Sequence, residues 1–457
     1  MAEPTPEPTV VPPDLEKPFG LKVVKPSETI PPPEQVLPQP TEGFPSSCSQ
    51  NSGYARPGTA SVAEDDISPQ YPSLPPPTRS KPWLGIIPNA TNQDGDGAVF
   101  EEDGYTLAIV EFDDQGVCYD RRQMIAFAAA LERFQGRKPI VIVFTHGWRH
   151  DGRSDDGNLA DFRLLLKQTA IDGGGRPIFG IFVAWRGLSW CGPAPVELSS
   201  FWGRKGAALR VALGSVRELF GRLRGFREAE RDAGRAPLLV IIGHSFGGLI
   251  VYSAVAQSLI EAASTQGGKI IPSFADMVLL VNPAFEAARY LPIFQQIDGR
   301  HDFAAEQPPI FVAVTAYNDL ATKLAFLAGV LFTSWGQSTR SGTRERQALL
   351  NTIGHLDWMQ THELSTPLLK LRATRQPRIA PQPGQITRRQ RVVTGRPELD
   401  FPLGARLTLL QNRDLHNPFW VVGATPTVVD GHNGIFGDVF VDFVFHLVAS
   451  HAAQQAG

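Results

Sequence analysis

The chain has 457 residues, enough for one large domain or two smaller ones, and its 42% hydrophobic residues can fill a sizeable core. A net charge of −3 gives no general attraction to nucleic acid or to an anionic membrane surface, so no nucleic-acid partner is expected. The only cysteines are Cys48, Cys118 and Cys191, and their spacing matches neither a disulfide framework nor a zinc site.

Residues 1–80 are dense in proline, serine, threonine and glutamate, in runs such as PPPEQVLPQPTEGFPSS. Such a segment cannot bury enough apolar surface to offset its ordering entropy, which predicts a disordered tail. Its proline clusters could bind polyproline-recognising modules, although the sequence identifies no particular protein partner. The first residues lack the basic start and apolar run of a secretory signal, and no stretch of about eighteen apolar residues follows. We therefore expect a cytoplasmic protein without a transmembrane segment.

Residues 81–457 have a different pattern, in which apolar runs alternate with amphipathic stretches. Runs rich in valine and isoleucine predict strands buried on both faces, at 105–112, 139–147, 177–185, 237–245, 276–284 and 308–316. Helical patterns lie among them, at 120–134, 158–170, 202–233 and 247–263. This alternation predicts one α/β domain with a mostly parallel central sheet flanked by helices.

The region at about 365–400 interrupts this pattern. It carries eight basic residues and no acidic residue between Lys370 and Arg396. We interpret it as a solvated loop inserted into the domain, with binding of an anionic partner as the alternative. The apolar segments that follow it predict the last strands, a loop and a closing helix.

The stretch LLVIIGHSFGGLIVYSAVA, residues 238–256, predicts a sharp bend between a buried strand and a helix. The bend reads Gly243-His244-Ser245-Phe246-Gly247, a GxSxG pattern in the strand–turn–helix context that a nucleophile elbow requires. Small neighbours permit so tight a turn, which lifts the hydroxyl of Ser245 above the sheet edge. We therefore expect Ser245 to be a nucleophile.

The GHSFGG motif after one strand and the HGW motif after an earlier one together resemble the α/β-hydrolase superfamily, especially its lipase- and esterase-like members. The resemblance covers about residues 100–450 and extends to a group of uncharacterised hydrolases rather than to one enzyme. It implies an α/β-hydrolase fold and a Ser–His–acid triad whose acid and histidine follow the serine in that order.

His432 is the predicted general base, because it sits in the glycine-flanked loop VVDGHNGIF between the last apolar strand and the last helix. A serine hydroxyl needs such a base within hydrogen-bonding distance. His355, in NTIGHLDW, is the alternative.

Asp319 is the predicted orienting acid, because it follows the strand PPIFVAVTA at the sheet edge where catalytic groups gather. Glu286 and Asp430 are the alternatives, and Asp319 could also simply cap the next helix. The 113 residues between Asp319 and His432 are attributed to the basic insertion.

Two backbone N–H groups should face the developing oxyanion. One belongs to Phe246, the residue after the nucleophile. By resemblance the other belongs to Trp148 in the HGW motif, where Gly147 lets the backbone approach the substrate. His146 is interpreted as a structural brace for this loop.

No metal or nucleotide-cofactor motif occurs, so no cofactor is predicted. The predicted function is hydrolysis of carboxylic esters, small-molecule or lipid-like, through an acyl-enzyme on Ser245. The alternatives are an acyltransferase using the same triad and a non-catalytic scaffold or binding protein of this fold.

Overall fold

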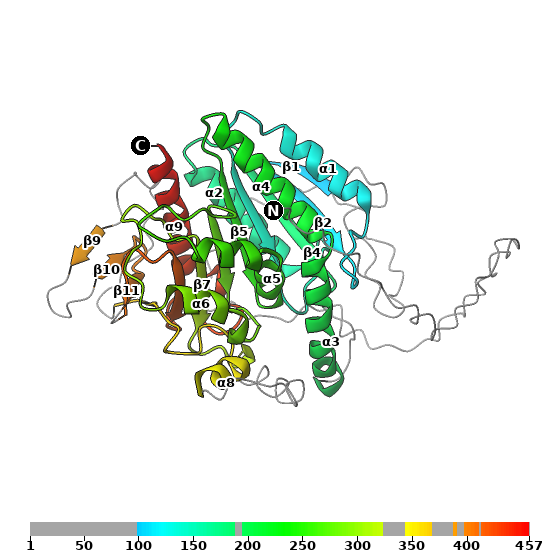
Figure 1. The fold of residues 1–457 in the computed structure, drawn as a ribbon. Coiled ribbons are helices and arrows are strands. Elements are labelled where there is room, and N and C mark those ends of the chain that lie inside the picture. The colour runs from blue at the N-terminus through cyan, green and yellow to red at the C-terminus, as the bar shows by residue number, and fades with distance from the viewer. Residues whose placement is uncertain are drawn as a thin grey trace, which may run out of the picture. The chain divides into compact units, whose positions relative to one another are not determined.

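In the computed structural model, twelve strands among the described residues form one mixed sheet (Figure 1). The structure describes residues 98–187, 194–322, 343–367, 387–390, 397–410 and 413–456, and all of them belong to the unit Cys48–Gly457. The predicted tail at 1–80 lies outside these residues, as does most of the predicted basic loop.

The strand order across the sheet is β1-β2-β4-β3-β5-β6-β7-β12-β8-β11-β10-β9. Of the eleven pairings between described strands, the seven from β2 to β8 are parallel, and the four at the two ends are antiparallel. The strands are β1 Val99–Glu102, β2 Tyr105–Phe112, β3 Ile140–Thr145, β4 Ile178–Trp185, β5 Leu238–His244, β6 Met277–Val281, β7 Phe311–Ala316, β8 His362–Ser365, β9 Thr387–Gln390, β10 Pro397–Asp400, β11 Arg406–Leu409 and β12 Phe419–Ala424.

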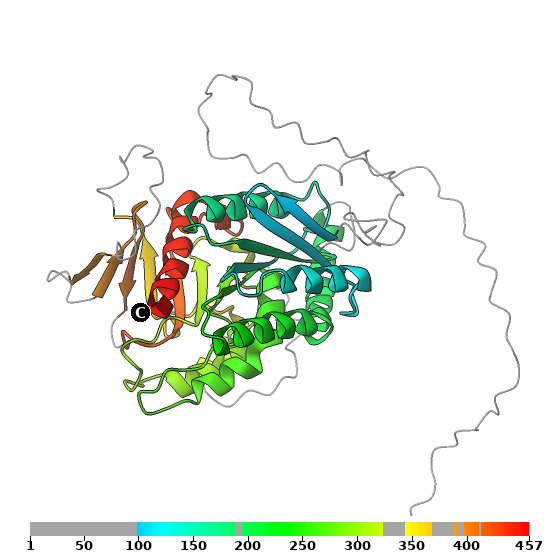
Figure 2. The ribbon, with the colours of Figure 1, turned by 90° about the horizontal axis from the view of Figure 1, so that it is seen from above.

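Helices cover both faces of the sheet, as Figure 2 shows from above. One apolar cluster joins the sheet to α1, α3, α4, α5 and α6, and a second joins the opposite face to α2 and α9. The helices are α1 Arg121–Glu132, α2 Gly157–Asp172, α3 Ala194–Leu213, α4 Val216–Asp232, α5 Phe246–Ala263, α6 Leu291–Ile297, α8 Thr343–Leu350 and α9 Asp438–Ala456, with short 3₁₀ turns η4 Ala287–Arg289 and η7 Gly434–Phe436. The expected α/β architecture is thus confirmed as a mixed sheet flanked by helices.

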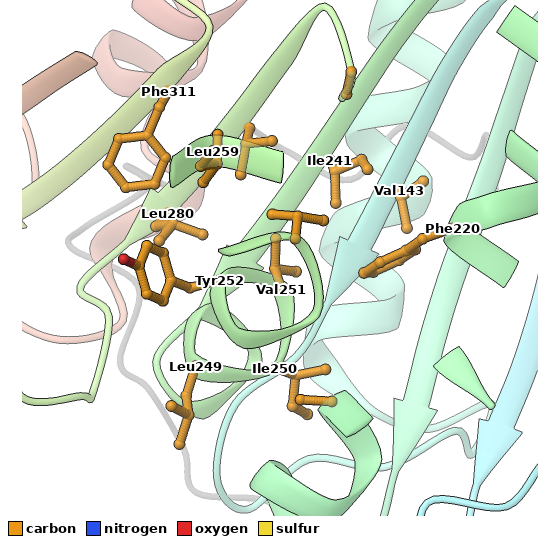
Figure 3. Packing of buried hydrophobic residues seen from close by; sticks show 14 of the residues in the cluster. Val143, Phe220, Ile241, Leu249, Ile250, Val251, Tyr252, Leu259, Leu280 and Phe311 are labelled. Atoms are coloured by element: carbon orange, nitrogen blue, oxygen red, sulfur yellow. The ribbon is translucent and has the colours of Figure 1, made fainter. Parts of the chain in front are cut away.

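The central strands are buried along their whole length because both of their faces are covered. Along β5, Ile241 packs on one face with Val251 of α5, while Ile242 packs on the other. Figure 3 shows α5 lying on the sheet, with Val251 directed toward the strands and Tyr252 beside Leu280 of β6. Continuous apolar runs predicted these strands well because neither face needs a polar residue.

Helix α5 has the length and composition of a membrane-spanning segment, and it is the one helix in the described part of the chain that does. It is nevertheless a core helix, because it packs against β5, β3 and β6 of the sheet and against α3. The structure therefore offers no clear transmembrane segment among these residues.

The helical pattern at 202–233 forms two helices, which corrects the single helix predicted there. The break falls at Gly214–Ser215, where the N–H of Ser215 donates to the carbonyl of Gly116 at 2.7 Å. A Cβ at Gly214 would collide with the backbone of Gly116, and a Cβ at Gly116 would collide with the backbone of Arg210. The position at which the first helix ends is therefore set by contact with the loop at Gly116, about 100 residues earlier in the chain.

The predicted basic loop also needs correction where it is described. Residues 387–390 and 397–400 form β9 and β10, which pair with each other, and β10 pairs with β11. The segment TRRQ lacks the alternation of apolar and polar residues that predicts a strand. Its extended conformation depends instead on pairing with β10.

Candidate active site

Ser245 occupies the predicted bend between β5 and α5. Its φ of 55° and ψ of −119° fall in a region that residues with a Cβ rarely adopt, a strain of roughly 1–3 kcal/mol. Backbone hydrogen bonds hold the bend, because the N–H of Ser245 donates to Val281 at 3.1 Å and its carbonyl accepts from Ala284 at 3.1 Å. The end of β6 and the loop after it therefore hold the backbone that carries the hydroxyl.

The glycines around Ser245 are required by close backbone approach. A Cβ at Gly243 would lie 2.7 Å from the carbonyl oxygen of Gly247, and a Cβ at Gly247 would collide with the carbonyl of Thr145. Gly147 approaches the side chain of the serine itself, because its added Cβ would be 2.7 Å from the Cβ of Ser245. The elbow and the HGW loop thus pack directly against each other.

Ser245, His432 and Asp319 form one hydrogen-bonded chain, although they lie far apart in the sequence. Ser245 Oγ is 2.9 Å from His432 Nε2, and His432 Nδ1 is 2.8 Å from Asp319 Oδ2. The three residues come from the end of β5, the loop after β12 and the loop after β7. Parallel strands bring these ends to the same edge of the sheet.

The charge on Asp319 determines which ring nitrogen of His432 carries the proton. Burial raises the pKa of Asp319, but hydrogen bonds from His432 and Thr322 outweigh it and hold that pKa below its usual value. An ionised carboxylate only accepts, so His432 Nδ1 donates to Asp319, and in the neutral imidazole Nε2 is then the acceptor that faces the hydroxyl of Ser245. This is the tautomer that a general base needs.

Asp319 also binds the backbone that directly follows it, and the helix that it was predicted to cap lies outside the described residues. Its Oδ1 accepts from the N–H groups of Ala321 and Thr322, at 3.0 and 3.1 Å, while Oδ2 faces His432. The aspartate is fully buried. The backbone bonds therefore orient the carboxylate toward the imidazole.

The other predicted candidates lie elsewhere. Glu286 forms an ion pair with Lys205 and a second with Arg289 at 3.2 Å. Asp430 accepts from Asn318 Nδ2 at 2.8 Å. His355 Nε2 lies 2.9 Å from Thr322 Oγ1 and is directed there rather than at Ser245.

His146 connects the HGW loop to the end of β4. Burial lowers the pKa of His146 to about 4, so its ring is neutral. Nδ1 donates to Gly147 O at 2.9 Å, Nε2 accepts from Trp185 N at 3.1 Å, and Trp185 Nε1 donates to His146 O at 3.0 Å. The same ring stacks on Trp185. These contacts fit the predicted bracing role.

The backbone N–H groups of Trp148 and Phe246 lie on the two segments that pack together at the elbow. None of the hydrogen bonds among the described residues uses either N–H. Phe201 of α3 packs on both side chains, with ring centroids 5.5 Å from Trp148 and 4.6 Å from Phe246. A shared aromatic contact thus links the two segments that carry the predicted donors.

Sequence reasoning missed two asparagines at this edge. Asn318 Oδ1 accepts from Gly431 N at 2.9 Å, and Asn282 Nδ2 donates to His432 O at 2.8 Å. His244, expected only as part of the elbow, also donates from Nε2 to His432 O at 2.9 Å. The signal that selected Asp319, a polar residue just after a buried strand, would have found Asn282 and Asn318 too.

Within the described ranges, no three histidine, cysteine, aspartate or glutamate side chains are grouped to hold a metal ion. A scan against models of known protein families found no match to the chain. A search of curated proteins likewise found none.

Proposed function

We propose that the protein is a serine hydrolase of the α/β-hydrolase superfamily that cleaves carboxylic esters through an acyl-enzyme on Ser245. One observation carries the proposal: the continuous hydrogen-bonded chain from Ser245 Oγ through His432 to the buried Asp319. The parallel strands β2 to β8, the strained bend, and the order serine, acid, histidine support the proposed fold family.

In the proposed reaction, Ser245 Oγ attacks the ester carbonyl carbon while His432 Nε2 takes the hydroxyl proton. The N–H groups of Trp148 and Phe246 stabilise the oxyanion, each contributing roughly 3–4 kcal/mol in the transition state. The intermediate collapses as the carbon–oxygen bond to the leaving alcohol breaks and His432 returns the proton to that oxygen. Water, deprotonated by His432, then attacks the acyl-enzyme and releases the acid and Ser245.

The proposed substrates are small-molecule or lipid-like esters. Trp148 supports this class, because this partly exposed residue carries one of the proposed oxyanion donors and packs on the apolar core. Ser245 itself is only 2% exposed, which favours a substrate that reaches it through a narrow approach. A cytoplasmic location remains part of the proposal.

The test is turnover of a chain-length series of p-nitrophenyl esters at neutral pH. We expect wild type to hydrolyse at least one member, and Ser245→Ala and His432→Ala to lose that activity. His355→Ala is the matched control, since it removes a histidine that contacts Thr322 and not Ser245, and it should keep kcat. Loss of turnover in His355→Ala with retention in His432→Ala would contradict the assigned base.

Product analysis tests whether water or an alcohol accepts the acyl group from Ser245. With water and a competing alcohol both present, we expect the free acid as the main product. An ester of the added alcohol as the main product would redefine the protein as an acyltransferase with the same triad. A folded wild type that turns over no ester in the series would contradict the esterase proposal.

A further inference from the structure

Two side chains from other elements hold the main-chain carbonyl oxygen of His432. Asn282 Nδ2 donates to it at 2.8 Å and His244 Nε2 donates to it at 2.9 Å. We call these two donors the carbonyl clamp. The same histidine presents Nδ1 to Asp319 and Nε2 to Ser245, so the clamp acts on the residue whose ring must meet both partners.

Asn282 is placed to connect the His432 loop with the strand that leads to Asp319. It follows β6 directly and is fully buried. Its Oδ1 accepts from Ala316 N at the end of β7 at 2.9 Å, and its Nδ2 donates to Gly431 O at 3.0 Å as well as to His432 O. One amide therefore links the His432 loop to the end of β7, from which the chain continues to Asp319.

The residue type at this position follows from those contacts. The site needs an acceptor on one side and a two-hydrogen donor on the other, and only an amide side chain supplies both. Asn282 also has a φ of 46°, a left-handed conformation that asparagine tolerates better than most residues. Glutamine would share the chemistry but not the short reach.

His244 supplies the second half of the clamp. Its Nε2 faces a carbonyl, so Nε2 carries the proton and Nδ1 is bare, and Nδ1 has no hydrogen-bond partner among the residues that the structure describes. Burial, followed by the nearby His432, lowers the pKa of His244 well below its usual value, so the ring stays neutral. His244 is thus a neutral, buried imidazole whose one N–H group holds the carbonyl of His432.

We propose that Asn282, together with His244, is a positioning device that sets the register of His432 between Ser245 and Asp319. This inference rests on the proposed function, because it assigns Asn282 no contact with substrate. The His432 loop contains Gly431 in a left-handed conformation and the side chain of His432 is 20% exposed, so its own packing leaves freedom that the clamp removes. Displacing a reacting group by about 1 Å costs roughly 100-fold in rate.

The decisive variant is Asn282→Asp, which keeps shape, the acceptor to Ala316 and tolerance of a positive φ. It replaces the donor with a carboxylate oxygen that repels the carbonyl of His432. We expect kcat to fall about 10- to 100-fold at pH 8 with KM changed less than about threefold. When the new carboxyl is protonated it can donate to His432 O, so the ratio of variant to wild-type kcat should rise as the pH is lowered toward about 5.5.

Asn417→Asp is the matched control. Asn417 is also buried and uses Oδ1 to accept from a backbone N–H, that of Phe419 at 3.0 Å, but it precedes β12 and so lies at the opposite end of the strands. This control should lose stability, measured by its thermal midpoint, yet keep wild-type kcat and pH profile. His244→Phe, which removes the second donor and keeps a ring, should lower kcat selectively and without the low-pH recovery.

The outcomes distinguish failure of the proposed function from failure of the proposed role of Asn282. A wild type that neither hydrolyses esters nor reacts with a fluorophosphonate overturns the proposed function and this inference with it. An active wild type, with Asn282→Asp matching Asn417→Asp in kcat and in pH dependence, overturns the inference alone. If Asn282→Asp does not fold, His244→Phe decides: a kcat-selective loss supports the clamp, and wild-type kcat overturns it.

Discussion

Gly147 provides a sharp test of how tightly the HGW loop and the elbow fit. Its φ is not in the left-handed region, so alanine is acceptable to the backbone itself. The added methyl would lie 2.7 Å from Ser245 Cβ, 3.1 Å from His244 O and 3.3 Å from His244 Nδ1. We expect Gly147→Ala to separate the two proposed oxyanion donors.

The expected magnitude follows from that overlap. Non-bonded carbon atoms prefer a separation of roughly 3.5–4.0 Å, so the loop must retreat by about 1 Å. A displacement of that size costs roughly 100-fold in rate, and complete loss of one oxyanion donor costs roughly 100- to 1,000-fold. We therefore predict that kcat falls about 100- to 1,000-fold, while overpacking lowers the free energy of unfolding by about 1–3 kcal/mol.

The assay is turnover of the best p-nitrophenyl ester alongside urea unfolding. Gly225→Ala is the control, because Gly225 lies on the exposed side of α4, where an added Cβ meets no atom within 4 Å. That control should gain about 0.5–1 kcal/mol of stability and keep its activity. Wild-type kcat in a folded Gly147→Ala variant would refute the close packing of loop and elbow as a requirement for activity.

Three further predictions concern charge. Asp319→Asn should leave the fold intact and lower ester turnover by roughly 10⁴-fold, because the imidazole loses its orienting acceptor; near-normal turnover would exclude Asp319 as the acid. Burial raises the pKa of Glu111 from 4.5 to about 7, so the folded state holds an extra proton between those values and stability falls as pH rises through them. Glu111→Gln should remove that dependence, worth about 3 kcal/mol, and urea unfolding at pH 5 and pH 8 measures it. Asp276→Ala should cost about 3–5 kcal/mol in the same assay, because it leaves the buried guanidinium of Arg227 unpaired, and a cost under about 1 kcal/mol would contradict this.

Local sequence patterns predicted the strands and the elbow because their causes are local. Strands buried on both faces must be continuously apolar, and the bend at Ser245 needs glycine on both sides wherever it occurs. The position of His432 and Asp319 could also be expected, because parallel strands end at one edge and loops there meet. These features need no knowledge of which distant segments touch.

The remaining features depend on contacts between distant residues. Glu286 was an open alternative to Asp319 because both follow buried strands, and only the fold shows that Lys205 of α3 pairs with Glu286. The break between α3 and α4 likewise depends on Gly116, a residue in another loop. Strand β9 depends on pairing with β10, since its own residues carry no apolar pattern.

The central claim is tested most directly by fluorophosphonate labelling of the folded wild type at neutral pH, with the modified residue identified by mass spectrometry. We predict one covalent adduct, located on Ser245, which is absent in Ser245→Ala and forms far more slowly in His432→Ala. Absence of any adduct, or an adduct on another residue that persists in Ser245→Ala, would contradict it.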